Sequence, residues 1–117
     1  MNYYYKVITK QDVTRSFVVN KNAVSHFFNV ALSQHGDEAI VHIRRSSINH
    51  FEAVAIVLHQ DCRLLIKNKD FNIGDIAYFE RIESNKFYFK VISGEAEKSL
   101  IIKRLPRSNF YLSNTKL

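Results

Sequence analysis

Two short polar stretches of this sequence collect side chains that hydrogen-bond to the base edges and phosphates of nucleic acids. The first, residues 9–16, offers Lys10, Gln11, Asp12, Thr14 and Arg15. The second, residues 44–50, offers Arg44, Arg45, Ser46, Ser47, Asn49 and His50. Cations mixed with amide and hydroxyl groups supply both base and phosphate contacts. Both stretches could equally be plain polar connections between strands, and their composition alone leaves the two interpretations level.

The residues that metal-dependent nucleases need are missing from their usual spacing. No Asp or Glu stands two residues before a lysine, so the acidic-x-Lys half of a common nuclease metal site is lacking. Asp61-Cys62-Arg63 is the nearest approach, but arginine stays protonated and cannot replace a tunable lysine. Glycine-rich phosphate loops and a His-Glu-x-x-His motif are also missing. We therefore expect no catalytic residue, no metal and no cofactor, and the chain on its own is not expected to be an enzyme.

The histidines and the cysteine carry no clear chemical signature. The five histidines lack the paired close spacing that metal ligands usually show. Cys62 precedes an apolar stretch, where a free cysteine more often packs as a small hydrophobe than acts as a nucleophile. We expect these side chains to be structural or on the surface.

Composition limits the class of protein. With 117 residues and 46% hydrophobic content, the chain fits one globular domain, 1–117, and leaves little room for two. A single cysteine excludes an internal disulfide and favours a reducing, cytoplasmic setting. No apolar run approaches the roughly 20 residues that span a bilayer, so no membrane partner is expected. The 17 basic and 11 acidic residues give a charge of +6, which favours a polyanionic partner.

The first part of the chain alternates short apolar runs with polar ones. Residues 3–8 and 15–19 are rich in aromatic and β-branched residues and are predicted to be strands, with 9–14 as a loop between them. Asn20 can cap a helix that begins at Lys21. The apolar residues that follow lie at helical spacing. They are Ala23, Val24, Phe27, Phe28 and Ala31.

The rest of the chain is predicted to be mostly strand. Strands are expected at 39–43 and 51–58, flanking the polar connection 44–50, and a short one at 63–68. Alternating apolar residues predict a hairpin of 76–82 and 86–92, and a last strand is expected at 99–105, with an extended piece after Pro106. The predicted fold class is mainly β with one or two short helices, a seven-stranded open β-barrel or pseudobarrel.

Aromatic residues divide into a predicted core and an ambiguous set. Phe27, Phe28, Phe79, Phe87 and Phe89 are expected to be buried. Tyr3, Tyr4 and Tyr5 are consecutive, and because strand residues alternate between faces, at least one of them should be exposed. Such a tyrosine could stack on the bases of a single strand.

Two segments resemble the DNA-binding pseudobarrel family. Residues 5–28, YKVITKQDVTRSFVVNKNAVSHFF, are similar to the opening of the plant B-three domain, in which a strand, a Thr/Ser-x-x-Asp-Val loop, a strand and a short helix follow in this order. Residues 62–82, with the Gly74-Asp75 turn, resemble a later block of that family. The effector or recognition domains of EcoRII-type restriction endonucleases look similar too. The resemblance covers about residues 3–92.

The resemblance implies a sequence-specific double-stranded DNA-binding domain that grips the major groove with two arms, while a separate nuclease domain of the same polypeptide cuts. Carried over, the base-contacting residues of the first arm are Lys10, Gln11, Asp12, Thr14 and Arg15, and those of the second are Arg45, Ser46, Ser47, Asn49 and His50. Arg15 and Asn49 are the preferred base readers, and Asp12 accepts from cytosine or orients Arg15. Phosphate contacts fall to Lys21, Arg44, Lys67 and Lys69.

Three other functions remain open at this point. A transcription regulator would use the same arms. A small basic ribonuclease of the toxin type can act without a metal, and cleavage of RNA by this chain would identify it. A barrel that binds single strands or protein partners would prefer single strands over a duplex.

Overall fold

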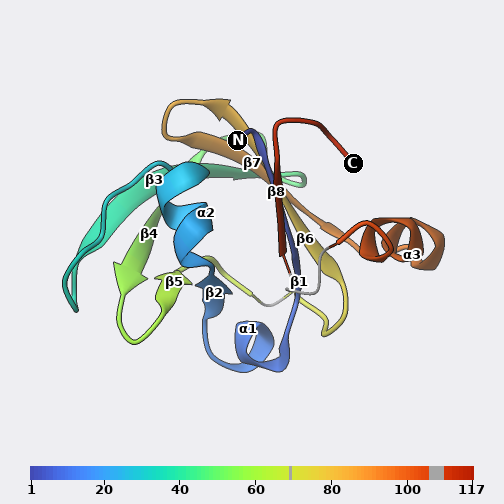
Figure 1. Cartoon of the computed structure of the whole chain (residues 1–117), viewed down its shortest axis with the longest axis horizontal. Coiled ribbons are helices and arrows are strands. Elements are labelled where there is room, and N and C mark those ends of the chain that lie inside the picture. The colour runs from blue at the N-terminus through green and yellow to red at the C-terminus, as the bar shows by residue number, and fades with distance from the viewer. Residues whose placement is uncertain (69, 106–109) are drawn as a thin grey trace.

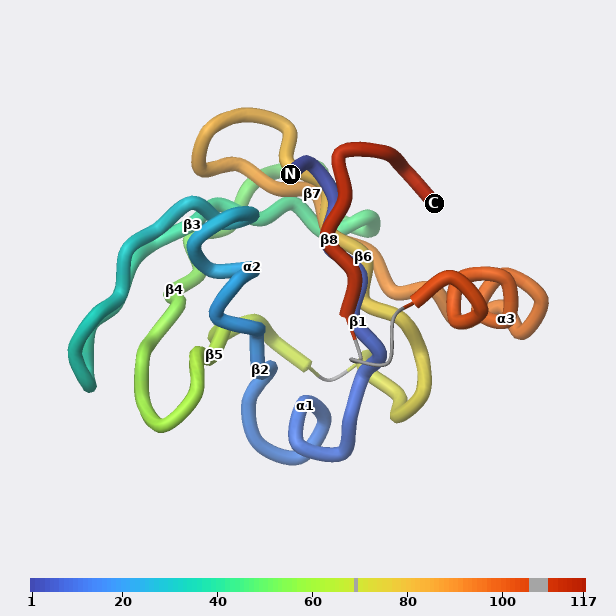
Figure 2. The backbone as a smooth tube through the Cα atoms, viewed as in Figure 1, coloured from blue at the N-terminus to red at the C-terminus, as the bar shows by residue number. Residues whose placement is uncertain are grey.

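The fold is an eight-stranded, strongly curled sheet that forms an open half-barrel, as the computed structural model shows for residues 1–68, 70–105 and 110–117 (Figure 1, Figure 2). The strand order is β2-β5-β4-β3-β7-β6-β1-β8. The strands are β1 (Tyr3–Val7), β2 (Phe17–Val19), β3 (Glu38–Arg45), β4 (Glu52–Leu58), β5 (Cys62–Leu64), β6 (Ile76–Glu83), β7 (Lys86–Ile92) and β8 (Phe110–Ser113).

Most neighbouring strands run antiparallel, and β3 and β7 form a parallel pair in which Ile43 lies opposite Phe87. This pair joins the β3–β4 hairpin to the β6–β7 hairpin, so two hairpins distant in sequence form one continuous sheet. The mainly β class and the open barrel are confirmed. The prediction of seven strands is wrong, because the described residues of the tail add β8 beside β1.

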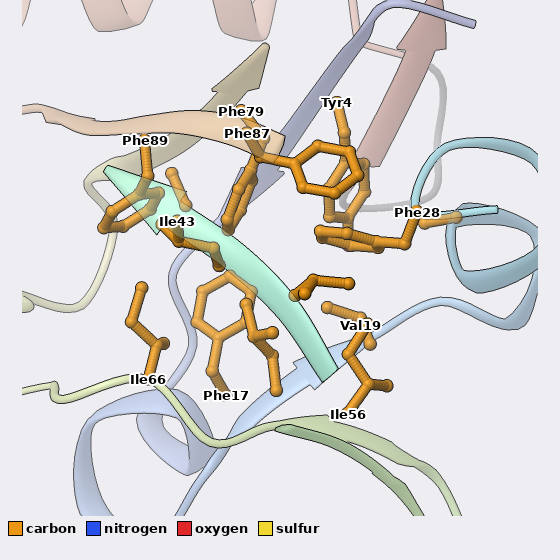
Figure 3. Close-up of a cluster of buried hydrophobic side chains, with 14 of the residues drawn as sticks. Tyr4, Phe17, Val19, Phe28, Ile43, Ile56, Ile66, Phe79, Phe87 and Phe89 are labelled. Carbon is orange, nitrogen blue, oxygen red and sulfur yellow. The ribbon is translucent and has the colours of Figure 1, made fainter. Parts of the chain in front are cut away.

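The inner face of the curled sheet carries the main core (Figure 3). Alternation along β1 and β6 sends Tyr4 and Phe79 inward, where their rings stack with centroids 5.6 Å apart. Phe27 and Phe28, just after the second helix, pack edge to face at 4.9 Å and fill the hollow. All five phenylalanines predicted to be core are buried: Phe27, Phe28, Phe79, Phe87 and Phe89.

The structure contains three helices in its described part, α1 (Lys10–Thr14), α2 (Lys21–His26) and α3 (Glu95–Ile102). The side chain of Asn20 caps α2 by accepting from the Asn22 amide at 2.8 Å, as predicted. The helix is shorter than predicted, because Asn29 adopts a left-handed conformation with φ of 59°, and Ala31 lies beyond it and is exposed. In Figure 1, α2 lies across the hollow of the sheet and α3 lies on the side away from β4.

Two predicted elements have the wrong type. Residues 10–14 form α1 and not a loop, because Thr9 and Asp12 make a reciprocal capping box. The expected strand at 99–105 is instead the end of α3 and the turn that follows it, since the helix begins at Glu95 with acidic residues in its first turn. The extended piece expected after Pro106 is β8 from Phe110 onward, and residues 106–109 lie outside the described part.

Candidate nucleic-acid interface

A buried ion pair anchors α1 to the inner face of β1. The ammonium of Lys6 lies 2.5 Å from the carboxylate of Asp12, whose side chain is completely buried. That carboxylate also accepts from the backbone amides of Thr9, at 2.8 Å, and Val18, at 2.9 Å. Burial lowers the pKa of Lys6, and the hydrogen bonds to Asp12 offset part of this shift. The pair thus fixes a five-residue helix between β1 and β2.

Asp12 is therefore not available to a base in this conformation. The expectation that Asp12 accepts from cytosine or orients Arg15 is wrong for this structure, because its oxygens are bonded to Lys6 and to backbone amides inside the fold. Its role here is to hold the helix that carries the other side chains.

The remaining first-arm residues lie together on the surface of α1 and just after it. Lys10, Gln11, Thr14 and Arg15 line one depression of about 350 Å³. Lys10, Thr14 and Arg15 are exposed, and Gln11 is half-buried. The hydroxyl of Thr14 donates to the Lys10 carbonyl at 2.9 Å, which leaves its oxygen free to accept. The helix thus presents two cations, one amide and one hydroxyl from a fixed backbone.

The turn between β4 and β5 lies beside α1, which the sequence prediction missed. The amide of Gln11 lies 3.5 Å from the carboxylate of Asp61, which also accepts from Arg63 at 2.9 Å. The hydrogen bond from Arg63 holds the pKa of the Asp61 carboxyl below its usual range. In the sequence, Asp61-Cys62-Arg63 stands out only as an incomplete nuclease motif. The opposite charges of Asp61 and Arg63, two positions apart, were the available signal in the sequence.

A connection after β5 joins α1 to the end of β3. The side-chain amide of Asn68 donates to the carbonyls of Asp12, at 3.0 Å, and Val13, at 2.9 Å. One residue earlier, the carbonyl of Lys67 accepts from the guanidinium of Arg45. The two predicted arms are thus linked through this segment. Lys67 has an exposed side chain suited to a phosphate contact, and Lys69 lies outside the described residues.

The second predicted arm is shorter than expected. Arg44 and Arg45 belong to strand β3 and not to the loop. The guanidinium of Arg45 also lies over the rings of Phe71, at 5.8 Å, and Phe89, at 5.6 Å, so its position is set by packing. The exposed residues of the connection are Ser46, Ser47, Asn49 and His50. Lys21, a predicted phosphate contact, is exposed at the start of α2.

The other candidate chemical groups form no metal site in the described part of the chain. No three histidine, cysteine, aspartate or glutamate side chains gather there in a way that could hold an ion. The rings of His35 and His59 lie 5.2 Å apart. Cys62 is buried, and burial raises the pKa of its thiol, which disfavours a reactive thiolate.

Comparisons with known proteins give a match in fold. No family model and no curated protein matches this sequence. None of the described helices has the length and apolar character needed to cross a bilayer. Among solved structures, the N-terminal domain of Helicobacter pylori LlaJI.R1 is similar to this chain, with a TM-score of 0.81 and 21% identity over 99% of this chain and 100% of that one. The two chains share one fold along their whole length.

Proposed function

We propose that this chain is a sequence-specific double-stranded DNA-binding domain that belongs to a restriction system. In this proposal α1 enters the major groove, with Arg15 and Gln11 contacting base edges. Lys10, Lys21 and Lys67 contact phosphates, and the connection after β3 forms the second arm. Cleavage would belong to a separate nuclease domain, and the chain itself would bind without cutting.

The observation that carries the proposal is the rigid mounting of α1. Base readout needs donors held in a fixed geometry, because each good bidentate pair contributes about 1–3 kcal/mol of discrimination only when it is aligned. The buried pair of Lys6 and Asp12 holds the side chain of one α1 residue, and the amide of Asn68 donates to two α1 carbonyls. Arg15, with five donors in a planar fork, follows directly from this anchored helix.

Two further findings support the proposal. The net charge of +6 suits a polyanion. The fold is shared with the N-terminal domain of Helicobacter pylori LlaJI.R1, whose name is that of a restriction-system protein.

Selection from a randomised duplex pool at moderate salt tests the proposal. We expect a short motif among the retained sequences, and we expect Arg15→Ala to lose it. Lys103→Ala is the matched control, because it also removes one exposed cation but lies after α3. Retention of the motif by Arg15→Ala, or equal loss in both variants, would rule out base reading by α1. Incubation of the chain with duplex and Mg²⁺ should leave the DNA intact, and cleavage would contradict the assignment of cutting to another domain.

A further inference from the structure

The outer face of the sheet carries a second group of aromatic and cationic side chains, away from α1. Strand pairing places Arg44 opposite Tyr88, Lys90 opposite Tyr78, and Tyr78 opposite Tyr5, all on adjacent strands. Side chains in register on neighbouring strands point to the same face. Tyr4 and Lys6, which face inward and support the main core and α1, alternate with Tyr5. This group therefore lies on the opposite face of the sheet from α1.

These side chains surround an open depression of about 400 Å³, here called the outer depression. Its walls and floor include Arg44, Tyr78, Glu80, Tyr88, Lys90 and Lys116. Lys116 reaches the depression from the C-terminal tail, so residues distant in sequence converge on one place. The volume is large enough for a phosphate together with part of the group that bears it.

The cations of the outer depression are held by aromatic rings. The guanidinium of Arg44 lies 5.1 Å from the centre of the Tyr88 ring. The ammonium groups of Lys90 and Lys116 lie 5.4 and 5.5 Å from the ring of Tyr78. Cation–π contacts of this kind fix a charge without neutralising it. Among the described residues, none of the three cations has a carboxylate within 4.0 Å.

Glu80 is the acidic residue that lines the outer depression. Its carboxylate accepts a hydrogen bond from the hydroxyl of Tyr78 at 2.8 Å. The depression has three cations and one carboxylate, which is hydrogen-bonded to Tyr78, so its net charge is positive. Three positive groups around a concave surface are the arrangement that binds phosphate oxygens.

We propose that the outer depression binds a phosphate-bearing ligand through Arg44, Lys90 and Lys116. The phosphate can belong to the backbone of a nucleic-acid strand or to a free nucleotide. Ser46 and Lys90 also line the neighbouring depression of about 140 Å³ beside the second arm, so a strand could continue from one to the other. This inference does not depend on base reading by α1.

Two probes distinguish the two sources of phosphate. Fluorescein-labelled single-stranded (dT)12 presents a phosphodiester backbone, and thymidine 5′-diphosphate presents a free nucleotide. Binding is measured by anisotropy for the strand and by NMR of ¹³C-labelled tyrosine rings for both probes. We expect the ring signals of Tyr78 and Tyr88 to shift. Shifts with the strand alone identify a nucleic-acid backbone as the ligand, and shifts with the diphosphate at similar affinity identify a free nucleotide.

The variant that removes the site is Lys90→Gln with Lys116→Gln, and its matched control is Lys86→Gln with Lys103→Gln, which also removes two exposed lysines. We expect the first pair to weaken binding of the probe about ten-fold or more, since charge-assisted contacts are lost. For (dT)12 the slope of log K against log salt should fall by about 1.4, at roughly 0.7 for each phosphate contact. Lys116 is exposed and near the C-terminus, so the single variant Lys116→Gln should fold normally. It keeps the test valid if the double variant folds poorly.

Three results would overturn the inference. They are tyrosine signals that do not move with either probe, equal weakening by the control pair, and no weakening by Lys116→Gln and the double variant. The ring signals of Tyr78 and Tyr88 report on the outer depression separately from α1, because these tyrosines lie on the opposite face of the sheet. A failure of duplex selection therefore leaves the outer depression intact, and a failure here leaves the proposed role of α1 intact.

Discussion

Tyr78 and Phe79 are neighbours in β6, yet they belong to two different cores on the two faces of one sheet. The inner core contains every phenylalanine of the chain except Phe51, either buried or packed against it. The outer cluster contains every tyrosine except Tyr4. Phenylalanine brings area without a polar atom, and tyrosine adds a hydroxyl that must find a partner or water. The inner face is thus built for stability, and the outer face keeps polar groups at the surface.

The same division separates the two proposed binding surfaces. The inner side holds α1 through the buried pair of Lys6 and Asp12, so its exposed residues project from a rigid base. On the outer side, α3 and the C-terminal tail cover one part of the tyrosines through Ile101 and Leu117. The uncovered part is the outer depression, with its three cations.

Truncation in the inner core should have the largest effect on stability. Phe79 is fully buried and its ring lies 4.6 Å from Phe89 and 5.6 Å from Phe28. We expect Phe79→Ala to lower the free energy of unfolding by about 3–5 kcal/mol, because it leaves a cavity among rings that cannot collapse into it. Ile82→Ala, on the same strand but 46% exposed, should change it by only about 0.5 kcal/mol. Urea unfolding measures both, and similar losses would refute the assignment of the core to the inner face.

Loss of the buried carboxylate comes next. Asp12→Ala should lower the free energy of unfolding by about 3 kcal/mol, because it leaves the ammonium of Lys6 buried without a partner. Asp61→Ala removes the partly exposed ion pair with Arg63 and should cost less than about 1 kcal/mol. Thermal or urea unfolding of the two variants distinguishes them. Equal costs would mean that the Lys6–Asp12 pair does not anchor α1.

The smallest expected effect concerns the outer hydroxyls at high pH. Burial is the main cause that raises the pKa of Tyr78, and the hydrogen bond to Glu80 raises it further. Burial also raises the pKa of Tyr5. A group that binds its proton more tightly when folded stabilises the fold fully below its unfolded pKa of about 10, and this stabilisation is lost as the pH rises further. Urea unfolding at pH 8 and pH 11, with tyrosinate absorbance at 295 nm, should show the decline.

Tyr78→Phe provides the control for that pH series. It should cost about 1 kcal/mol at pH 8 through loss of the bond to Glu80. The free energy of unfolding of this variant should decline less between pH 8 and pH 11 than that of the wild type. An identical decline would show that Tyr78 does not contribute.

Elements with local signals were predictable from the sequence. The alternation of apolar and polar residues predicted the β6–β7 hairpin, and Asn20 predicted the start of α2. The capping pair of Thr9 and Asp12 was also a local signal, but the run of polar residues around it favoured a loop. For α3, the apolar residues 100–102 suggested a strand, although Gly94 and the acidic residues after it are typical of a helix start.

The sites depended on contacts that no local pattern contains. Lys6 and Asp12 form their pair inside the fold because α1 packs against β1 and β2. From the sequence alone, Asp12 could not be distinguished from an exposed residue of the first arm. The outer depression exists because β3 pairs in parallel with β7, which places Arg44 beside Tyr88. Such register is set by tertiary structure.

The most direct test of the account is the affinity of three proteins for the selected duplex and for a shuffled duplex of equal length. The proteins are the wild type, Arg15→Ala, and Lys90→Gln with Lys116→Gln. If α1 reads bases, Arg15→Ala should lose about ten-fold or more of the preference for the selected duplex, and the outer double variant should keep that preference. A preference unchanged in Arg15→Ala but lost in the outer variant would contradict the assignment of sequence reading to α1.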